Sequence, residues 1–363
     1  MRAKKLLSAA AALAATAVPG LPAFAQSSVT VFGVIDSTVQ HASQGGASVN
    51  RLNGSGGNQI SRLGFRGTED LGGGLSAGFV LDMGLNIDTG TGGVTSANNQ
   101  TAAAASGLTF NRRSTVSLTS TQWGEVRLGR DFTPTYWNLT LFDPFGTAGA
   151  GSAANIIQSN LSKVSTVQTA LRASNSVGYF LPSMSGFYGQ LMYAMGENGS
   201  GAPNGTAKDG NYAGLRVGYA AGPLNVAIAH GRTSLASGDV STTNAGLAYD
   251  FGVAKPLLQL FQDRKEGVAA PSRSSGFLVG AQFPVGPGYI PVSYSRIKDN
   301  AAVERKANQV AVGYVYNLSK RTAVYTTFSR ISNSGGAALS GGGVPGVANA
   351  AWRGTDIGIR HSF

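Results

Sequence analysis

Arginine is the residue type whose spacing in this chain most clearly predicts a chemical role. Arg62 and Arg66 stand in a segment where Leu63 and Phe65 occupy the alternate positions. Successive side chains of a β-strand point to opposite faces, so the two arginines share the face away from the apolar pair. A guanidinium stays ionised at any working pH and presents fixed donors to carboxylate or phosphate groups. This pattern predicts electrostatic attraction of anions, with no bond made or broken.

The same alternation directs other charged side chains to the polar face of their segments. They are Arg113, Arg127, Arg216, Arg360, Asp82 and Glu125. Arg130 falls on the apolar face, and it reaches the polar side only if its segment bends there. In an alternative that stays open, some of these arginines only pair with acids such as Asp36.

The residue types that perform catalysis are not arranged for it. His41, His230 and His361 are far apart in the sequence, and none has a serine or paired carboxylates beside it in a recognisable arrangement. There is no H-E-x-x-H or P-loop motif, and no cysteine that could serve as nucleophile, thiolate ligand or disulfide. The sequence therefore predicts no enzyme, no metal site and no cofactor.

Strands must position the charged side chains, because short turns alternate with long polar loops along the chain. Seven short connections, such as 182–186 and 284–288, alternate with eight longer ones, centred on Gly45, Gly93, Gly151, Gly201, Ser237, Gly267, Ala301 and Gly341. Fifteen connections join sixteen strands, and an even number with short turns at one end is typical of bacterial outer-membrane barrels. About sixteen strands enclose an aqueous channel. We therefore predict an all-β fold, a transmembrane antiparallel β-barrel of sixteen strands.

Most of the expected strands are close to the ~9–11 residues that cross a membrane at a tilt. A cation at the lipid midplane would cost roughly 2–4 kcal/mol, which favours an inward position for the arginines. The strands are expected at residues 29–37, 59–68, 75–85, 109–118, 124–131, 173–181, 187–195, 211–220, 223–232, 242–251, 254–262, 275–283, 289–298, 306–316, 322–331 and 352–363.

An export signal is predicted at the N-terminus. Arg2, Lys4 and Lys5 precede an apolar stretch over residues 6–18, and Ala23-Phe24-Ala25 follows. This order is typical of a secretory signal, residues 1–25, that leaves one mature domain over residues 26–363. The formal net charge falls from +11 to +8 with the leader. The remaining basic residues are dispersed, which predicts an electropositive lumen and no nucleic-acid partner.

One loop, residues 132–171, is far longer than the ~12–15 residues at which structureless loops become unusual. It opens with residues 133–145, which are too apolar for a water-exposed tip. We expect this third loop to fold into the barrel lumen. The alternative is a surface loop packed on its own side chains.

Several motifs, taken in order, resemble those of the Gram-negative general porins, especially the beta-proteobacterial type, across essentially the whole mature length. They are the segments 28–36, 61–72, 124–131, 172–179, 317–322 and 358–363. The resemblance implies a homotrimer in the outer membrane, in contact with lipid and lipopolysaccharide, with the third loop as a pore constriction. The C-terminal Phe363 is similar to the signal by which such barrels engage the barrel-assembly machinery.

The resemblance also implies the residues of the constriction. On the wall and at the ends of the loop they are Arg62, Arg66, Arg130 and Arg172, and the nearest acid on the loop is Asp143. The loop carries no acid between Phe145 and Leu171, so its acidic side is expected to be weak. We therefore expect passive diffusion of small hydrophilic solutes, anionic and neutral, with a preference for anions. The alternative is a substrate-selective channel lined by a ladder of binding groups.

Overall fold

The computed structural model describes residues 28–96, 98–100, 109–159, 161, 167–182, 184–267 and 272–363. The expected leader, residues 1–25, lies outside them. The strands are β1 (Ser28–Gln44), β2 (Ala47–Asn53), β3 (Arg62–Gly72), β4 (Leu75–Asn86), β5 (Thr91–Gly92), β6 (Arg113–Ser120), β7 (Gly124–Phe132), β8 (Arg172–Phe180), β9 (Phe187–Ala194), β10 (Tyr212–Ala221), β11 (Leu224–Thr233), β12 (Val240–Tyr249), β13 (Lys255–Lys265), β14 (Ser272–Val285), β15 (Gly288–Asp299), β16 (Lys306–Asn317), β17 (Thr322–Ser334) and β18 (Trp352–Ser362). The helices are α1 (Pro134–Leu141), α2 (Ala154–Ile157), and the 3-10 turns η2 (Gln168–Ala170) and η3 (Pro203–Lys208). Within the described residues, no helix is long and apolar enough to span a membrane.

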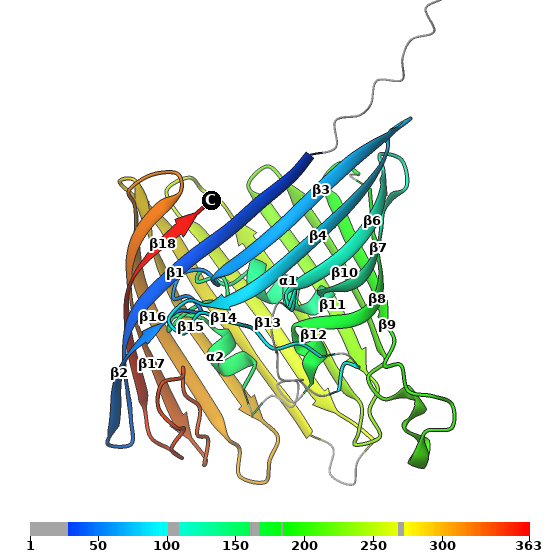
Figure 1. The fold of residues 1–363 in the computed structure, drawn as a ribbon. Coiled ribbons are helices and arrows are strands. Elements are labelled where there is room, and N and C mark those ends of the chain that lie inside the picture. The colour runs from blue at the N-terminus through cyan, green and yellow to red at the C-terminus, as the bar shows by residue number, and fades with distance from the viewer. Residues whose placement is uncertain are drawn as a thin grey trace, which may run out of the picture.

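The strands close into a single antiparallel barrel (Figure 1). The first and last strands pair with each other, in the register that sets Val34 opposite Ser362. Two of the labelled strands, β2 and β3, pair with successive lengths of β1, so together they fill one position in the wall. The two-residue β5 pairs with β4 alone. The wall therefore has the sixteen positions that the sequence predicted.

The first connection differs from its expectation. A long loop centred on Gly45 was predicted, and this prediction is wrong: β1 continues to Gln44, and a two-residue turn leads directly into β2. Gly45 and Gly46 adopt φ of 57° and 88°, which suits a glycine pair in a tight hairpin. The segment from Gln40 to Asn53 is rich in polar residues, and its composition therefore resembles a loop although it forms ladder pairs throughout.

The wall is interrupted between β2 and β3, and a buried carboxylate organises the break. The side chain of Asp36 accepts hydrogen bonds from three consecutive backbone N–H groups, those of Gly57 (3.3 Å), Asn58 (3.0 Å) and Gln59 (2.7 Å). These donors would otherwise lack partners, because residues 54–61 leave the ladder. Asp36 thus has a local structural role, and it forms no ion pair with an arginine in the part of the chain that the structure describes.

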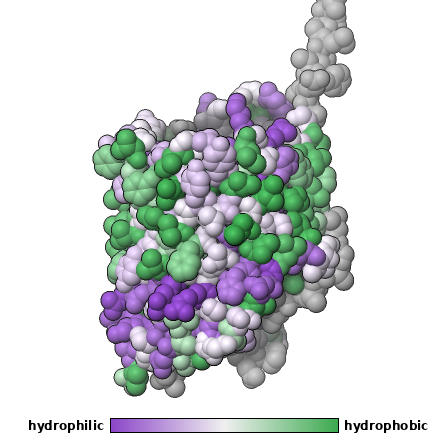
Figure 2. All heavy atoms as spheres, turned by 90° about the vertical axis from the view of Figure 1, so that its left-hand side faces the viewer, coloured by the Kyte–Doolittle hydropathy of each residue, from purple (hydrophilic) through white to green (hydrophobic). Residues whose placement is uncertain are grey.

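Apolar side chains cover the outside of the barrel. Ile228, Leu260 and Val310 are each more than half exposed, whereas their neighbours Ala229 and Gln309 are buried on the other side of the wall. Figure 2 shows the resulting hydrophobic surface over the middle of one side, with hydrophilic residues below it. This is the alternation of a barrel that meets lipid outside and polar groups inside.

Candidate functional site

A cavity of about 740 Å³ lies between β3, the first part of the third loop, the starts of β13 and β15 and the end of β14. The charged side chains that line it are Arg62, Arg66, Arg112, Arg113, Lys255, Asp82 and Asp143. Five cations therefore face two carboxylates. A second cavity of about 650 Å³ lies between the third loop and residues 338–346. Thr147 lines both cavities, so they meet at the third loop.

Arg62 and Arg66 line the cavity from β3, as the alternation predicted. The guanidinium carbon of Arg66 lies 5.4 Å from the ring centroid of Phe32, an inward residue of β1. Such a cation–ring contact holds the side chain in place without neutralising its charge. Within the described residues, neither arginine forms an ion pair. Their charge is therefore available to a solute.

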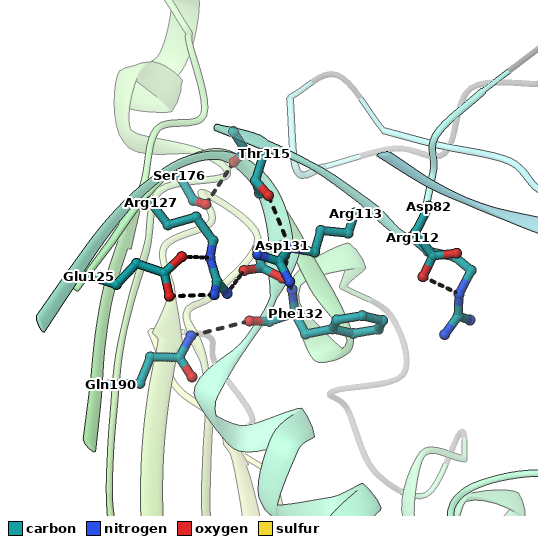
Figure 3. A network of polar contacts seen from close by, with 11 residues as sticks. Asp82, Arg112, Arg113, Thr115, Glu125, Arg127, Asp131, Phe132, Ser176 and Gln190 are labelled. Carbon is teal, nitrogen blue, oxygen red and sulfur yellow. Dashed lines mark hydrogen bonds and ion pairs between the residues drawn. The ribbon is translucent and has the colours of Figure 1, made fainter. Parts of the chain in front are cut away.

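Arg112 is a cavity residue that the sequence argument missed. Its Nε lies 3.1 Å from Oδ2 of Asp82 on β4, and its guanidinium lies 5.4 Å from the ring of Phe132 (Figure 3). The expected strand began at residue 109, which placed Arg112 on the outward face. In the structure β6 begins four residues later, at Arg113, so Arg112 lies outside the strand and alternation does not govern it.

A second charged cluster lies on β6 and β7 (Figure 3). Arg127 donates to both oxygens of Glu125, at 3.0 and 2.9 Å, and also pairs with Asp131. Arg113 lies 3.8 Å from the same Asp131. Two cations here face two carboxylates, so the cluster adds little net charge. The predicted inward positions of Arg113, Arg127 and Glu125 bring these side chains together.

Two of the residues carried over by resemblance do not line the cavity directly. Arg130 donates from Nε to the carbonyl oxygen of Asn111 and from Nη1 to Oγ of Ser174, both at 2.7 Å. Arg172 lies over the ring of Phe132, at 4.6 Å from its centroid. Neither arginine is among the residues that line the cavity. Arg130 stands opposite Ser114 of β6, at a register shift in the pairing of β7 with β8 between Gly129 and Asp131.

Asp143 is the loop acid of the cavity, and it is fully enclosed. Its two oxygens accept hydrogen bonds from the backbone N–H groups of Phe145 and Ala153, both at 2.9 Å. Burial raises the pKa of Asp143 to about 6, although these hydrogen bonds oppose the shift. The only acid that the third loop presents to the cavity therefore titrates near neutral pH.

The remaining predicted arginines bond to neutral groups. Arg216 donates from Nε to Oδ1 of Asn138 on α1 at 2.6 Å and stacks on the ring of Tyr188. Arg360 donates from Nη1 to Oδ1 of Asn58 at 2.7 Å. Asn58 itself lines the cavity, whereas the bond of Arg216 fixes the loop helix to the wall.

Polar side chains of the wall hold the third loop at several other points. Gln259 Nε2 donates to the carbonyl oxygen of Asn138 at 3.0 Å, and Gln309 Nε2 donates to that of Ala150 at 3.1 Å. The ring of Phe142 packs on the wall at Gly246, where a β-carbon would collide with it. Direct bonds to well-separated strands, β13 and β16, fix the loop along its length.

The sequence also did not predict the residues on the far wall of the cavity. Lys255, Gln282 and Tyr289 line it from β13, β14 and β15. Consecutive leucines, Leu257 and Leu258, hide the alternation of β13. The signal that could have located Lys255 is the inward Gln259, because residues 255 and 259 share one face of a strand.

The closed barrel and its charged cavity define a membrane channel of the β-barrel class. A family model described as Gram-negative porin matches residues 9–336. The chain belongs to this family. Outer membrane porin protein 32 of Delftia acidovorans is 37% identical over 375 residues, which cover 99% of this chain and 100% of that protein.

Two solved structures support the same assignment of fold. An anion-selective porin from Comamonas acidovorans has a TM-score of 0.80 and 34% identity, and the match covers 93% of this chain and 100% of that chain. OmpT of Vibrio cholerae in a trimer form, at 15% identity, has a TM-score of 0.60 over 93% of this chain and 99% of that chain.

These findings confirm the predicted family, the sixteen-stranded barrel, the outer-membrane location and the function as a porin. Members of this family are passive channels and not enzymes. The names of the relatives do not favour the alternative of a substrate-selective channel. Within the described residues, no group of three or more His, Cys, Asp or Glu side chains could hold a metal ion.

Proposed function

We propose that the channel passes small hydrophilic solutes, anionic and neutral, by diffusion and prefers anions. The observation that carries this proposal is the excess of cations in the cavity, where Arg62, Arg66 and Lys255 have no carboxylate partner within the described residues. The similar Comamonas porin is described as anion-selective. A charge 4 Å from a passing ion is worth ~1 kcal/mol in water and ~4 kcal/mol at an effective dielectric of 20. Several such charges favour anions about tenfold or more.

The third loop sets the width of the channel in this proposal. Its bonds to Gln259 and Gln309 and its contact at Gly246 keep the backbone close to inward side chains of the wall. Arg62 and Arg66 then face the loop across the cavity, with Asp143 as the acid on the loop side. Arg172 supports the start of the loop through the ring of Phe132, and Arg130 ties Ser174 of β8, just after the end of the loop, to the wall.

The test is the reversal potential of a planar bilayer across a salt gradient. Arg62→Ala combined with Arg66→Ala removes two unpaired cavity cations, and we expect the anion preference to fall several-fold. The matched control is Lys320→Ala with Arg321→Ala, which removes the same charge from an exposed turn that is screened within ~8–10 Å. Cation preference in the wild type would reject the proposal. An unchanged reversal potential in the double variant would reject the role of this arginine pair.

We also propose that residues 1–25 are a leader that is removed, leaving residues 26–363 as one barrel domain. The order of basic, apolar and small-residue segments supports this. The intact mass of protein purified from outer membranes checks the cleavage site. A mature chain that begins at Met1 would overturn it.

The trimer remains a proposal. OmpT of Vibrio cholerae, which shares the fold, is described in a trimer form. On this chain, Val29 and Val31 of β1 are 66% and 52% exposed, and apolar surface of this kind packs on a neighbouring barrel as readily as on lipid. Native mass spectrometry in mild detergent tests the assembly, and monomers alone would count against it.

The C-terminal residue is proposed to engage the barrel-assembly machinery. Phe363 pairs its backbone with Gly33 of β1, at 3.0 and 3.1 Å, and its side chain remains 45% exposed. Phe363→Ala should lower the amount of folded protein in the outer membrane. Phe283→Ala, an exposed aromatic of β14, is the control. Equal amounts of the two variants would argue against a specific role for Phe363.

A further inference from the structure

One aromatic side chain of the wall lies between two arginines of the cavity. Phe32 on β1 stands opposite Gly64 of β3 in the strand register. Its ring lies directly over Gly64, where a β-carbon would collide with it. Arg62 and Arg66 stand two positions before and after Gly64 on the same face of β3, and a glycine inside a strand commonly marks such a close approach. An arginine therefore flanks the ring in each direction along β3.

The ring and both cations are open to the lumen. Phe32 is only half-buried, and it lines the cavity together with Arg62 and Arg66. Within the described residues, neither arginine forms an ion pair. The contact of Arg66 with the ring, at 5.4 Å from the centroid, leaves its charge uncompensated. A solute that reaches this part of the wall meets a free cationic charge and an apolar ring at the same place.

A carboxylate stands at the same level of the wall, but it already has a partner. Asp82 of β4 is the cross-strand partner of Gly64. Its Oδ2 accepts a hydrogen bond from Nε of Arg112 at 3.1 Å (Figure 3). This ion pair carries no net charge, so the positive charge of Arg62 and Arg66 remains available to an anion.

A second ring in the cavity also lies beside arginines, but it is enclosed. Phe132 lies 5.4 Å from the guanidinium of Arg112 and 4.6 Å from that of Arg172. Tyr136 stacks on the same ring, with the centroids 5.3 Å apart, and Phe132 is only 8% exposed. Its neighbours already occupy the surroundings of this ring. Phe32 is therefore the better placed of the two to receive a solute.

The loop side of the cavity also exposes apolar surface. Leu141, the last residue of α1, lines the cavity and is 38% exposed. Trp137, one turn earlier on the same face of the helix, lines the cavity as well. Apolar side chains of this kind do not attract small hydrophilic ions, whereas they favour removal of the apolar part of a solute from water. The cavity thus combines unpaired cations with apolar surface on both of its sides.

We propose that this part of the cavity is a subsite for aromatic carboxylates, an inference that rests on the anion preference of the proposed function. The ring of the solute lies against Phe32, and its carboxylate meets the guanidinium groups of Arg62 and Arg66. The cavity volume of about 740 Å³ is within the ~300–1,000 Å³ of ordinary ligand pockets. One ring contact and one hydrated charge hold the solute weakly, so it exchanges rapidly and diffusion through the channel continues.

The test titrates the current through the whole mature protein in a planar bilayer with three solutes of similar size. Benzoate has both the ring and the charge. Cyclohexanecarboxylate keeps the charge and an apolar body but has no flat aromatic face, and benzamide keeps the aromatic ring without the charge. The concentration that halves the reducible part of the current gives the affinity for each solute. The reversal potential in potassium chloride is measured on the same channels before each titration.

We expect the wild type to bind benzoate about two- to tenfold more tightly than cyclohexanecarboxylate, the range expected for one aromatic pair, and benzamide more weakly than either. Phe32→Leu should make the affinities for the two carboxylates equal, and Phe32→Tyr, which keeps the ring, should preserve their ratio. The matched control is Phe180→Leu, because Phe180 lies 4.0 Å from the guanidinium of Arg127 but does not line the cavity. This control should keep the wild-type ratio.

Two results would overturn the subsite while leaving the proposed function intact. The first is equal affinity of the wild type for benzoate and cyclohexanecarboxylate. The second is a wild-type ratio of these affinities in Phe32→Leu, since the ring would then have no part in binding. In both cases the reversal potential in potassium chloride still reports anion preference. A reversal potential that shows cation preference in the wild type would instead reject the proposed function, on which the subsite rests.

Discussion

The carboxylate of Asp356 on β18 accepts a 2.8 Å hydrogen bond from the backbone N–H of Ala150 in the third loop. Its other oxygen accepts a 2.8 Å hydrogen bond from Nε2 of Gln40 on β1. One buried side chain thus joins the first strand, the last strand and the third loop. The position of the loop depends on the seam at which the barrel closes.

Asp356→Ala should release the third loop at Ala150. The N–H of Ala150 and the amide of Gln40 would lose their acceptor, and an unsatisfied buried donor costs about 1–3 kcal/mol. We expect a lower unfolding temperature and a larger, noisier single-channel conductance. Asp250→Ala, in an exposed short turn, serves as the control. Wild-type conductance and noise in Asp356→Ala would show that the other wall contacts suffice to hold the loop.

The anion preference should depend on pH through Asp143. Its pKa is raised from an ordinary 3.8 to about 6 by burial, so the carboxyl group is neutral below pH 6 and ionised above it. As the pH falls from 7 to 5, the cavity loses a negative charge and the preference for anions should increase. Reversal potentials measured at both pH values check this.

Asp143→Asn should abolish that pH dependence while keeping the side-chain shape. In the wild type, the raised pKa of Asp143 also affects the free energy of unfolding. The contribution of this carboxyl group to stability is fully present below the unfolded pKa of 3.8 and is lost as the pH rises through about 6. If the anion preference of the wild type is the same at pH 5 and pH 7, protonation of Asp143 has no effect on permeation.

Arg112 and Arg130 should respond differently to substitution. Arg112→Ala leaves Asp82 unpaired in the cavity, which adds a net negative charge and should reduce the anion preference. Arg130→Ala removes bonds to Asn111 and Ser174 outside the cavity, so it should leave the reversal potential unchanged. Reversal potentials of the two variants in planar bilayers test this. A larger change for Arg130→Ala than for Arg112→Ala would indicate that Arg130 belongs to the constriction.

Gly246→Val should displace Phe142, because the side chain would occupy the space of the ring. Overpacking of this kind costs about 1–3 kcal/mol, and the loop would move into the remaining lumen and lower the conductance. Ala245→Val adds two carbon atoms, against three for Gly246→Val, on the lipid-facing side of β12 and should have little effect. Equal conductance of the two variants would mean that the loop adapts without narrowing the channel.

The sequence was sufficient to predict the barrel because strand alternation and turn chemistry are local. The prediction failed at the β1–β2 hairpin around Gly45. The residues of this hairpin are polar, as in a loop, although they form ladder pairs beyond the apolar band of the wall. Alternation located Arg62 and Arg66 correctly relative to their strand. It could not locate Arg112, since its position depends on where β6 begins.

The anchors of the third loop could not be predicted from spacing. Asp356 and Ala150 are far apart in the chain, and their contact follows from barrel closure together with the path of the loop. Arg130 falls on the apolar face of its strand by alternation, and it does not line the cavity. The resemblance to porins had placed it in the constriction.

The register between Val34 and Ser362 also has a kinetic consequence. The chain is made from its N-terminus, yet the edge of β1 acquires its partner only when β18, the last strand, is complete. Until then the growing sheet has two unpaired edges, and open edges pair readily with other chains. Contacts between such distant segments also make folding slow. A chain truncated before β18 should therefore aggregate instead of forming a smaller pore, so the end of the sequence acts as a checkpoint for the whole barrel.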